Sequence, residues 1–322
     1  MIERNAAWRT LPAVAAWDDT YRTLHMWLQI VGKIRLELSP WINHCWGSAF
    51  YLTPRGLTTS LLHYQGAAFS IDFDFVDHAL RIATAQGPVR SFALAPMSVA
   101  RFHEQTLSAL HELGIEVSIF QQPVEVVEAI PFDQDQLHRD YDAGAVQRVF
   151  GAFLDAGRVL TQFRARFIGK ASPVHFFWGS FDLAVTRFSG RPAPKHPGGA
   201  PHCADWVMQE AYSRELSSAG FWPGQGLGEA AFYSYAYPPP DGFASASVQP
   251  AEAYFHAGLG EFILPYEAVR RAPDPDAALL SFLQSTYEAA ATRAGWDRAA
   301  LEWQPPTRRR RRPDAAAPPS LP

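Results

Sequence analysis

The segment Phe69-Ser70-Ile71-Asp72-Phe73-Asp74-Phe75 alternates strictly between apolar and polar side chains. Successive side chains of a β-strand point to opposite faces, so the aromatic residues are expected on a buried face, with Asp72 and Asp74 together on the other. One covered and one wet face is typical of an antiparallel sheet. This strand therefore predicts an antiparallel sheet that packs on a helix.

Further short β-like runs surround this strand, at residues 49–53, 57–63, 80–84 and 89–94. Turn signals such as Pro54-Arg55-Gly56 and Gln86-Gly87-Pro88 separate them, as expected for an antiparallel meander. Apolar residues at helical spacing predict one amphipathic helix before the meander, at residues 21–38, and a second after it, at residues 98–113. A further strand is expected at residues 115–120.

The same order begins again after an acidic, proline-containing connector at residues 121–142. A long helix is expected from Val146 to Phe167, and it leads into Ile168-Gly169-Lys170, Ser172-Pro173 and Trp178-Gly179-Ser180. The first half contains Val31-Gly32-Lys33, Ser39-Pro40 and Trp46-Gly47-Ser48 in the same order. The pattern predicts an α+β tandem duplication, in which residues 1–130 and 131–300 each form a long helix packed on an antiparallel meander with a second helix.

Spacing supports this prediction. Trp46 precedes Arg55 by nine positions, and Trp178 precedes Arg187 by nine. Phe92, Leu94 and Val99 match Phe262, Leu264 and Val269 at an offset of 170 positions, against 132 at the tryptophans. The second half is therefore expected to carry an insertion at about residues 191–231, which is rich in proline and glycine around one helical run, 205–216. A helix at residues 277–294 should close this half.

Composition limits the class of protein. The formal net charge of -4 is too balanced to predict a nucleic-acid or membrane surface on the folded body. Two cysteines, Cys45 and Cys203, are too few for a disulfide-stapled secreted scaffold, and no apolar run is long enough to span a bilayer. We therefore expect a cytoplasmic protein. Residues 304–322, with the run Arg308 to Arg312, are expected to form a disordered tail.

Three segments carry a resemblance to a known family. They are residues 162–191, QFRARFIGKASPVHFFWGSFDLAVTRFSGR, residues 53–59, TPRGLTT, and residues 217–224, SSAGFWPG. Together they resemble a bacterial family catalogued as domain of unknown function 5996, over nearly the whole chain up to about Trp296. The resemblance implies one inherited architecture, and it brings no catalytic residues.

Both copies of the repeated motif place cations near the junction of helix and first strand. Lys170 and Arg187 belong to the second half, and His44 and Arg55 belong to the first. If the halves pack about a pseudo-two-fold axis, these groups and Arg191 face one cleft, where arginine would bind carboxylate or phosphate. We therefore predict that a small anionic or polar ligand binds between the halves, with the insertion as a cover. The alternative is that these cations are solvated helix-end and turn residues.

A candidate catalytic pair lies in the same stretch. Asp182 stands among apolar residues, so its carboxylate is either on an exposed strand face or buried with a partner. His175 could act as a base that Asp182 orients. The chain has no Gly-x-Ser-x-Gly elbow, so the hydrolase signal is weak.

Two other functional classes stay open. The aromatic residues of the insertion, or the arginine tail, could serve a non-catalytic interaction protein. Asp72, Asp74 and His78 could instead belong to a metal-dependent hydrolase, because both aspartates share a strand face. The sequence specifies neither a cofactor nor an oligomeric state.

Overall fold

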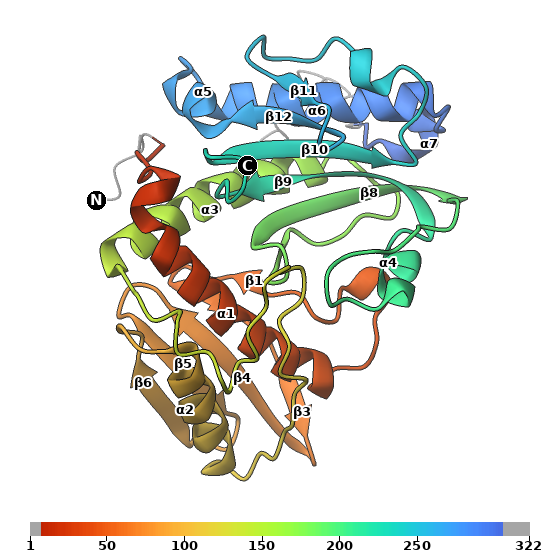
Figure 1. Cartoon of the computed structure of the whole chain (residues 1–322). Helices are drawn as coiled ribbons and strands as arrows, with labels where there is room; N and C mark the ends of the chain where they lie inside the picture. Colours follow the sequence, from red (N-terminus) through yellow and green to blue (C-terminus); the bar gives the residue numbers. More distant parts are fainter. Residues whose placement is uncertain (1–7, 305–322) are drawn as a thin grey trace, which may run out of the picture.

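The computed structural model describes residues 8–304, and the predicted tail lies outside them from residue 305 onward. The chain is an α+β protein with two antiparallel sheets, one at the bottom and one at the top of Figure 1. The first half comprises α1 (Val14–Leu38), the short helix η1 (Asn43–Cys45), β1 (Tyr51–Leu52), β2 (Gly56–Thr58), β3 (Leu62–Tyr64), β4 (Ala67–Asp74), β5 (Ala79–Thr84), β6 (Val89–Ala93) and α2 (Val99–His111).

The second half begins after the connector and ends near the last described residue. It comprises α3 (Ala143–Arg164), β7 (His175–Phe177), β8 (Asp182–Pro192), α4 (Asp205–Ala211), β9 (Arg214–Trp222), β10 (Ala231–Tyr237), η2 (Phe243–Ser245), β11 (Tyr254–His256), β12 (Glu261–Pro265), α5 (Tyr266–Arg271), α6 (Pro275–Arg293) and α7 (Arg298–Leu301).

Both sheets are antiparallel, and they meet at their first strands. The first has the order β1-β2-β4-β5-β6, with β3 also paired to β4, and the second has the order β11-β12-β10-β9-β8-β7. Phe50, just before β1, and Phe176 in β7 exchange two antiparallel backbone hydrogen bonds of 2.8 Å. The two sheets are therefore joined through the backbone at these edges.

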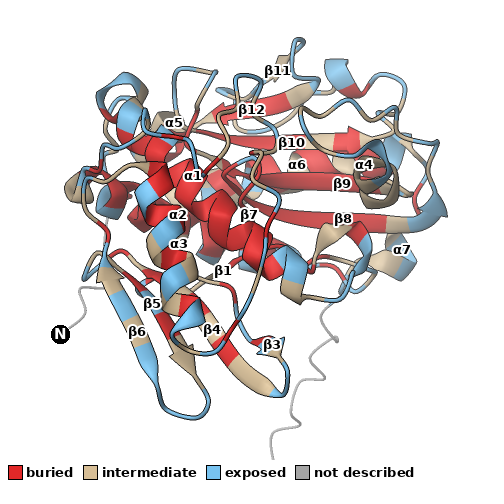
Figure 2. Cartoon of the chain, turned by 60° about the horizontal axis from the view of Figure 1, so that its bottom comes forward, coloured by how far each residue is buried: buried red, intermediate tan, exposed pale blue. Residues whose placement is uncertain are grey.

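The alternation of β4 is confirmed. Phe69, Ile71 and Phe73 are buried, whereas Asp72 and Asp74 are only partly covered. The buried face of this sheet packs with α1, which runs between the two sheets and is buried on almost every side (Figures 1 and 2). Trp27 of α1 is fully buried and stacks on the ring of Phe102 at a centroid distance of 4.8 Å.

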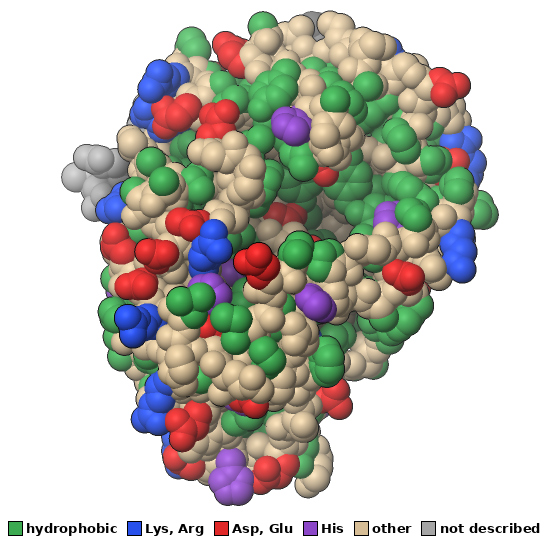
Figure 3. Space-filling view, viewed as in Figure 1, with side chains coloured by type: hydrophobic (Ala, Val, Ile, Leu, Met, Phe, Trp, Pro, Cys, Tyr) green, Lys and Arg blue, Asp and Glu red, His purple; other side chains and the backbone are tan. Residues whose placement is uncertain are grey.

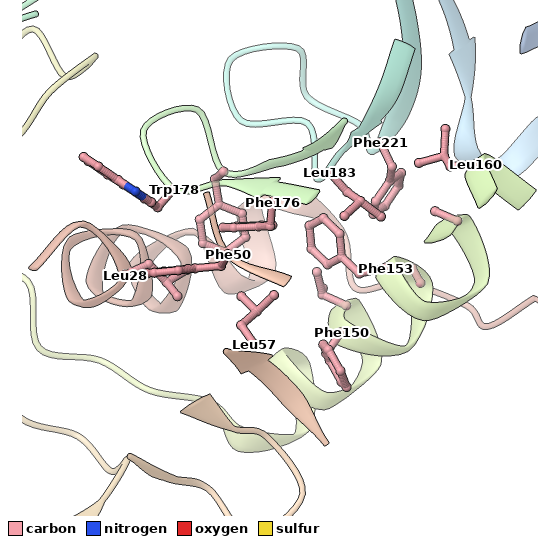
Figure 4. Close-up of a cluster of buried hydrophobic side chains, with 14 of the residues drawn as sticks. Leu28, Phe50, Leu57, Phe150, Phe153, Leu160, Phe176, Trp178, Leu183 and Phe221 are labelled. Atoms are coloured by element: carbon pink, nitrogen blue, oxygen red, sulfur yellow. The ribbon is translucent and has the colours of Figure 1, made fainter. Parts of the chain in front are cut away.

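One hydrophobic core runs through both halves. Figure 4 shows side chains of α1, the first strands of both sheets and α3 packed together. Phe153 of α3 contacts Phe176 and Phe221 of the second sheet at ring-centroid distances of 5.5 and 5.0 Å. Since the buried apolar surface is shared, each half stabilises the other.

Several expected elements differ from the structure. Residues 57–63 form parts of two short strands, and residues 115–120 form none, although Ile115 and Ile119 are buried. The segment predicted as an insertion contains β9, an interior strand of the second sheet, in addition to α4. Strand β9 escaped prediction because its small residues give no apolar alternation.

The repeated Trp-Gly-Ser motif lies at different points of the two halves. Trp46 precedes the edge strand β1, whereas Trp178 follows the edge strand β7. Arg55 lies in the turn between β1 and β2, but Arg187 lies inside the long strand β8. The tandem duplication is not confirmed by these placements, and it stays a prediction.

Candidate functional site

A cavity of about 1380 Å³ opens between the first helix and the second sheet. One wall is α1 and a second is the connector around residues 122–130. The starts of β8 and β12 form the floor, and β10 forms the wall opposite. The part of the predicted insertion before α4 also contributes, through His196 and His202. Figure 3 shows this hollow, with acidic side chains inside it.

Asp182, the first residue of β8, lies on the floor and is 6% exposed. Its carboxylate accepts hydrogen bonds from the hydroxyls of Ser180 and Tyr233. Burial raises the pKa of Asp182, and these hydrogen bonds oppose the shift. Gly220 makes the arrangement possible, because a Cβ there would lie 2.5 Å from the Tyr233 hydroxyl oxygen.

Two further carboxyl groups share the cavity. Burial raises the pKa of Glu125 and of Glu261 to about 7, and the charge of Asp182 adds to both shifts. Solvent reaches the Glu125 side chain through the cavity. Protein atoms nevertheless surround the carboxyl group and reduce its hydration. A Cβ on Gly179 would lie 2.5 Å from Glu125 Oε1, so the absence of a side chain at Gly179 leaves room for the Glu125 carboxylate.

The opposite wall is aromatic. Tyr233, Tyr235 and Tyr237 alternate along β10 and project to the same face of the sheet. The hydroxyls of Tyr235 and Tyr212 are 2.8 Å apart and share a hydrogen bond. The ring of His196 lies 4.6 Å from that of Tyr212, which ties the segment before α4 to this wall.

His25 of α1 holds the turn between β7 and β8, and Gln29 of the same helix holds the connector. Its Nε2 lies 3.0 and 2.9 Å from the carbonyl oxygens of Trp178 and Gly179, so Nε2 carries the proton and donates to them. Burial lowers the pKa of His25 to about 4, and the ring is neutral at pH 7. One turn later, the side chain of Gln29 exchanges two hydrogen bonds with the backbone of Val124, which holds the neighbouring Glu125 over the cavity.

Glu261→Gln should stabilise the protein at high pH. The folded pKa of about 7 exceeds the ordinary value of 4.5, so the folded state binds the proton more tightly than the unfolded chain. Stability is therefore lost as pH rises from about 4.5 to 7, and the loss is complete above 7. We expect the variant to gain about 1–2 kcal/mol in urea unfolding at pH 8 and to match the wild type at pH 4.5.

The exposed glutamate Glu252 supplies the matched control, since it does not line the cavity. Glu252→Gln should leave the free energy of unfolding nearly unchanged at both pH values. An equal gain from Glu261→Gln at pH 4.5 and pH 8 would show that ionisation is not its cause.

Of the residues predicted for the site, only Asp182 lines this cavity. His175 is fully buried in β7, and no hydrogen bond joins it to Asp182 or, among the described residues, to any other group. Burial and the charge of Arg35 lower the pKa of His175 to about 3. The predicted pair of base and orienting carboxylate is thus not formed in this structure.

His44 and Lys170 do come together across the halves. Lys170 Nζ lies 2.7 Å from His44 Nε2, and His44 Nδ1 lies 2.7 Å from the carbonyl oxygen of Ala211. The Lys170 ammonium also lies 5.5 Å from the ring of Trp46 and 5.1 Å from that of Phe188. This small cluster, in which His44 and Phe188 are buried, is separate from the cavity lining.

The three predicted arginines lie elsewhere. Arg187 is fully buried on the opposite face of the second sheet. Arg191 is exposed and forms an ion pair with Glu215 at 2.6 Å. Arg55 is exposed and pairs with Asp74 and Asp77, each at 2.6 Å. These arginines bind protein partners or pack in the core, so they do not converge on one cleft.

The residues of the metal hypothesis also have partners within the protein. Asp74 binds Arg55, and His78 Nδ1 lies 2.9 Å from the hydroxyl of Tyr141. Residues 8–304 contain no group of three His, Cys, Asp or Glu side chains arranged to hold a metal ion. Within the same residues, no helix has the length and apolar character needed to cross a membrane.

Sequence reasoning missed the two glutamates and His25. The tyrosines of β10 carry a signal that could have found them, since Tyr233, Tyr235 and Tyr237 alternate as expected for one face of a strand. No sequence pattern marks Glu125, because the position of the connector depends on tertiary contacts such as the hydrogen bond between Gln29 and Val124.

Comparison with known proteins gives one match. The model of a family of unknown function, DUF5996, matches residues 8–303. Neither a curated protein nor a solved structure matches the chain. The matched range covers nearly the whole chain, including every element that forms the cavity, and the chain therefore belongs to the DUF5996 family.

Proposed function

We propose that this protein binds a small polar organic molecule in the cavity between α1, the connector and the second sheet. The observation that carries the proposal is the cavity itself, whose volume of about 1380 Å³ exceeds that of typical small-molecule sites. Its lining combines aromatic rings with a few convergent polar groups, which is the usual composition of such sites. The cavity lies between α1 of the first half and the sheet of the second, and its lining contains carboxylates where cations were predicted.

Turnover of the ligand is part of the same proposal. Carboxyl groups whose pKa is about 7, as for Glu125 and Glu261, occur in both protonation states near neutral pH. That property suits a group that gives or takes a proton during a reaction. The raised pKa values therefore support general acid–base chemistry at this site.

We also propose that the two halves descend from one duplicated unit in a cytoplasmic protein. Each half runs from a long helix through an antiparallel meander to a second helix, and the edge strands β1 and β7 meet antiparallel. The free thiols of Cys45 and Cys203 agree with a reducing compartment.

The binding proposal is tested with ligands that survive gentle purification and are identified by mass spectrometry. Trp222 lines the cavity, and Trp222→Ala should weaken binding of such a ligand about tenfold, since one aromatic contact contributes roughly 1–1.5 kcal/mol. Trp206, exposed on α4 outside the cavity lining, provides the matched control. Titration calorimetry should give Trp206→Ala the wild-type affinity. Equal losses in both variants, or in neither, would contradict a site in the cavity.

A further inference from the structure

Building on the proposed function, we infer that the ligand carries a protonated amine. The ammonium group lies among the carboxylates of Asp182, Glu125 and Glu261, and the carbon skeleton packs on the tyrosines of β10. Charge balance, the inventory of hydrogen-bonding groups and the aromatic wall each support this ligand class.

The charges of the cavity lining are mostly negative. Four carboxylates line it, those of Asp182, Glu125, Glu128 and Glu261. Among the described residues of the lining, Arg22 is the sole Lys or Arg, and its guanidinium is already paired with Asp18 at 2.7 Å. A bound anion would meet uncompensated negative charge, whereas a bound cation would relieve it.

The hydrogen-bond donors next to Asp182 are already used within the protein. Ser180 and Tyr233 donate to Asp182, and the proton on His25 Nε2 is directed at two backbone carbonyls. The tautomer leaves His25 Nδ1 as an acceptor, and this atom has no hydrogen-bond partner among the described residues although His25 is 8% exposed.

Acceptors therefore predominate at the floor. The carboxylates of Glu125 and Glu261 accept no hydrogen bond from any described residue, and both line the cavity. An ammonium group has three donors and no acceptor, so it complements this set. Charge-assisted hydrogen bonds to carboxylates are also the stronger kind.

The wall offers ring faces to a cation. The rings of Tyr233 and Tyr235 stack at a centroid distance of 6.1 Å and an angle of 20°, and Trp222 lies at the end of the neighbouring strand. Aromatic faces attract ammonium groups and also bury alkyl chains. A site for a neutral sugar would use similar rings, so the comparison of cationic with neutral probes below decides between the two.

Binding of an amine should depend on pH. The ionisable groups that face the carboxylates are Tyr21, Arg22 and His25 from α1, His138 from the connector, His196 and His202 from the segment before α4, and Tyr212, Tyr233, Tyr235 and Tyr237 from the opposite wall. Burial keeps the pKa of Tyr21, Tyr212, Tyr233 and Tyr235 above 10 and lowers the pKa of His25 and His196. Glu125 and Glu261 have pKa values of about 7, so their ionisation near neutral pH makes the lining more negative and favours a cation.

The test compares isosteres of different charge on the full-length protein. Phenethylamine and spermidine are the cationic probes, 2-phenylethanol is the neutral probe and phenylacetate is the anionic probe, each titrated by calorimetry up to about 10 mM at pH 6 and pH 8. Both amines stay protonated throughout this range. We expect at least one amine to bind, with an affinity about tenfold higher at pH 8 than at pH 6, and the neutral and anionic probes to bind at least tenfold more weakly.

Variants separate the site from its surroundings. Asp182→Asn and Glu261→Gln should each weaken amine binding at pH 8 about tenfold, and Glu252→Gln should leave it unchanged. If Asp182→Asn does not fold, Glu261→Gln alone decides, because that side chain is only partly buried. Binding of 2-phenylethanol or phenylacetate as tight as that of the amines would overturn the amine inference and leave the proposed function standing. No binding of any probe would count against both.

Discussion

Replacing Gly32 with alanine is expected to destabilise the protein by about 2–3 kcal/mol, although alanine is the better helix former. Gly32 lies in α1, and a Cβ there would come within 2.3 Å of the Trp178 ring. The indole cannot move away easily, because Trp178 is buried and its Nε1 donates a 2.9 Å hydrogen bond to the carbonyl of Ser48. The gain in helix propensity, about 1 kcal/mol, offsets only part of the clash.

The helix α3 provides the control for this substitution. A Cβ on Gly144 would meet only the ends of two flexible side chains, those of Asp142 and Arg148, at 3.3 and 3.4 Å. Gly144→Ala should therefore be neutral or slightly stabilising in urea unfolding. Adding Trp178→Phe to Gly32→Ala should recover part of the loss in a double-mutant cycle. Additive effects would contradict direct packing of Gly32 on the ring.

The fold was predictable from the sequence where one face of a strand is buried and the other is exposed to solvent. The alternation of β4 located the first meander, because Asp72 and Asp74 stand between buried aromatic residues. Strand β9 was hidden because both of its faces are covered and its centre contains Ser217, Ser218 and Gly220. Small side chains there leave space for the larger residues of neighbouring strands, and Gly220 does so for the Tyr233 hydroxyl. The residues that shape the site thus weakened the strand pattern.

The site was less predictable than the fold. Asp182 was identified because a carboxylate in an apolar run needs an explanation, and the structure supplies one in its two hydroxyl partners. Glu125 becomes part of the cavity only through the contact of Gln29 with Val124, which joins residues 95 positions apart. Arginines were expected at a ligand because the guanidinium group binds carboxylate or phosphate, but residue type does not report burial, and Arg187 is fully buried.

Arg187 gives the second large prediction. Its guanidinium carbon lies 3.5 Å from the centroid of Phe163 and 4.4 Å from that of Tyr287, and the side chain is fully buried. Nη2 donates to the Phe163 carbonyl, whereas Nε and Nη1 have no partner among the described residues. Burial lowers the pKa of Arg187, because no carboxylate among residues 8–304 forms an ion pair that would compensate the lost hydration.

Removing the whole side chain and removing only its charge should therefore have different effects. Arg187→Ala is expected to lose about 3–5 kcal/mol, since it leaves a large hole between α3, α6 and the sheet. Arg187→Met keeps most of the volume and the contact with the rings, and it removes a desolvated charge, so its loss should be less than about 1 kcal/mol. Urea unfolding at pH 7 measures both values. If Arg187→Met lowered the free energy of unfolding as much as Arg187→Ala does, the cation–π contacts would be the main contribution of Arg187. If Arg187→Ala left the free energy of unfolding unchanged, the surrounding core would have collapsed into the space.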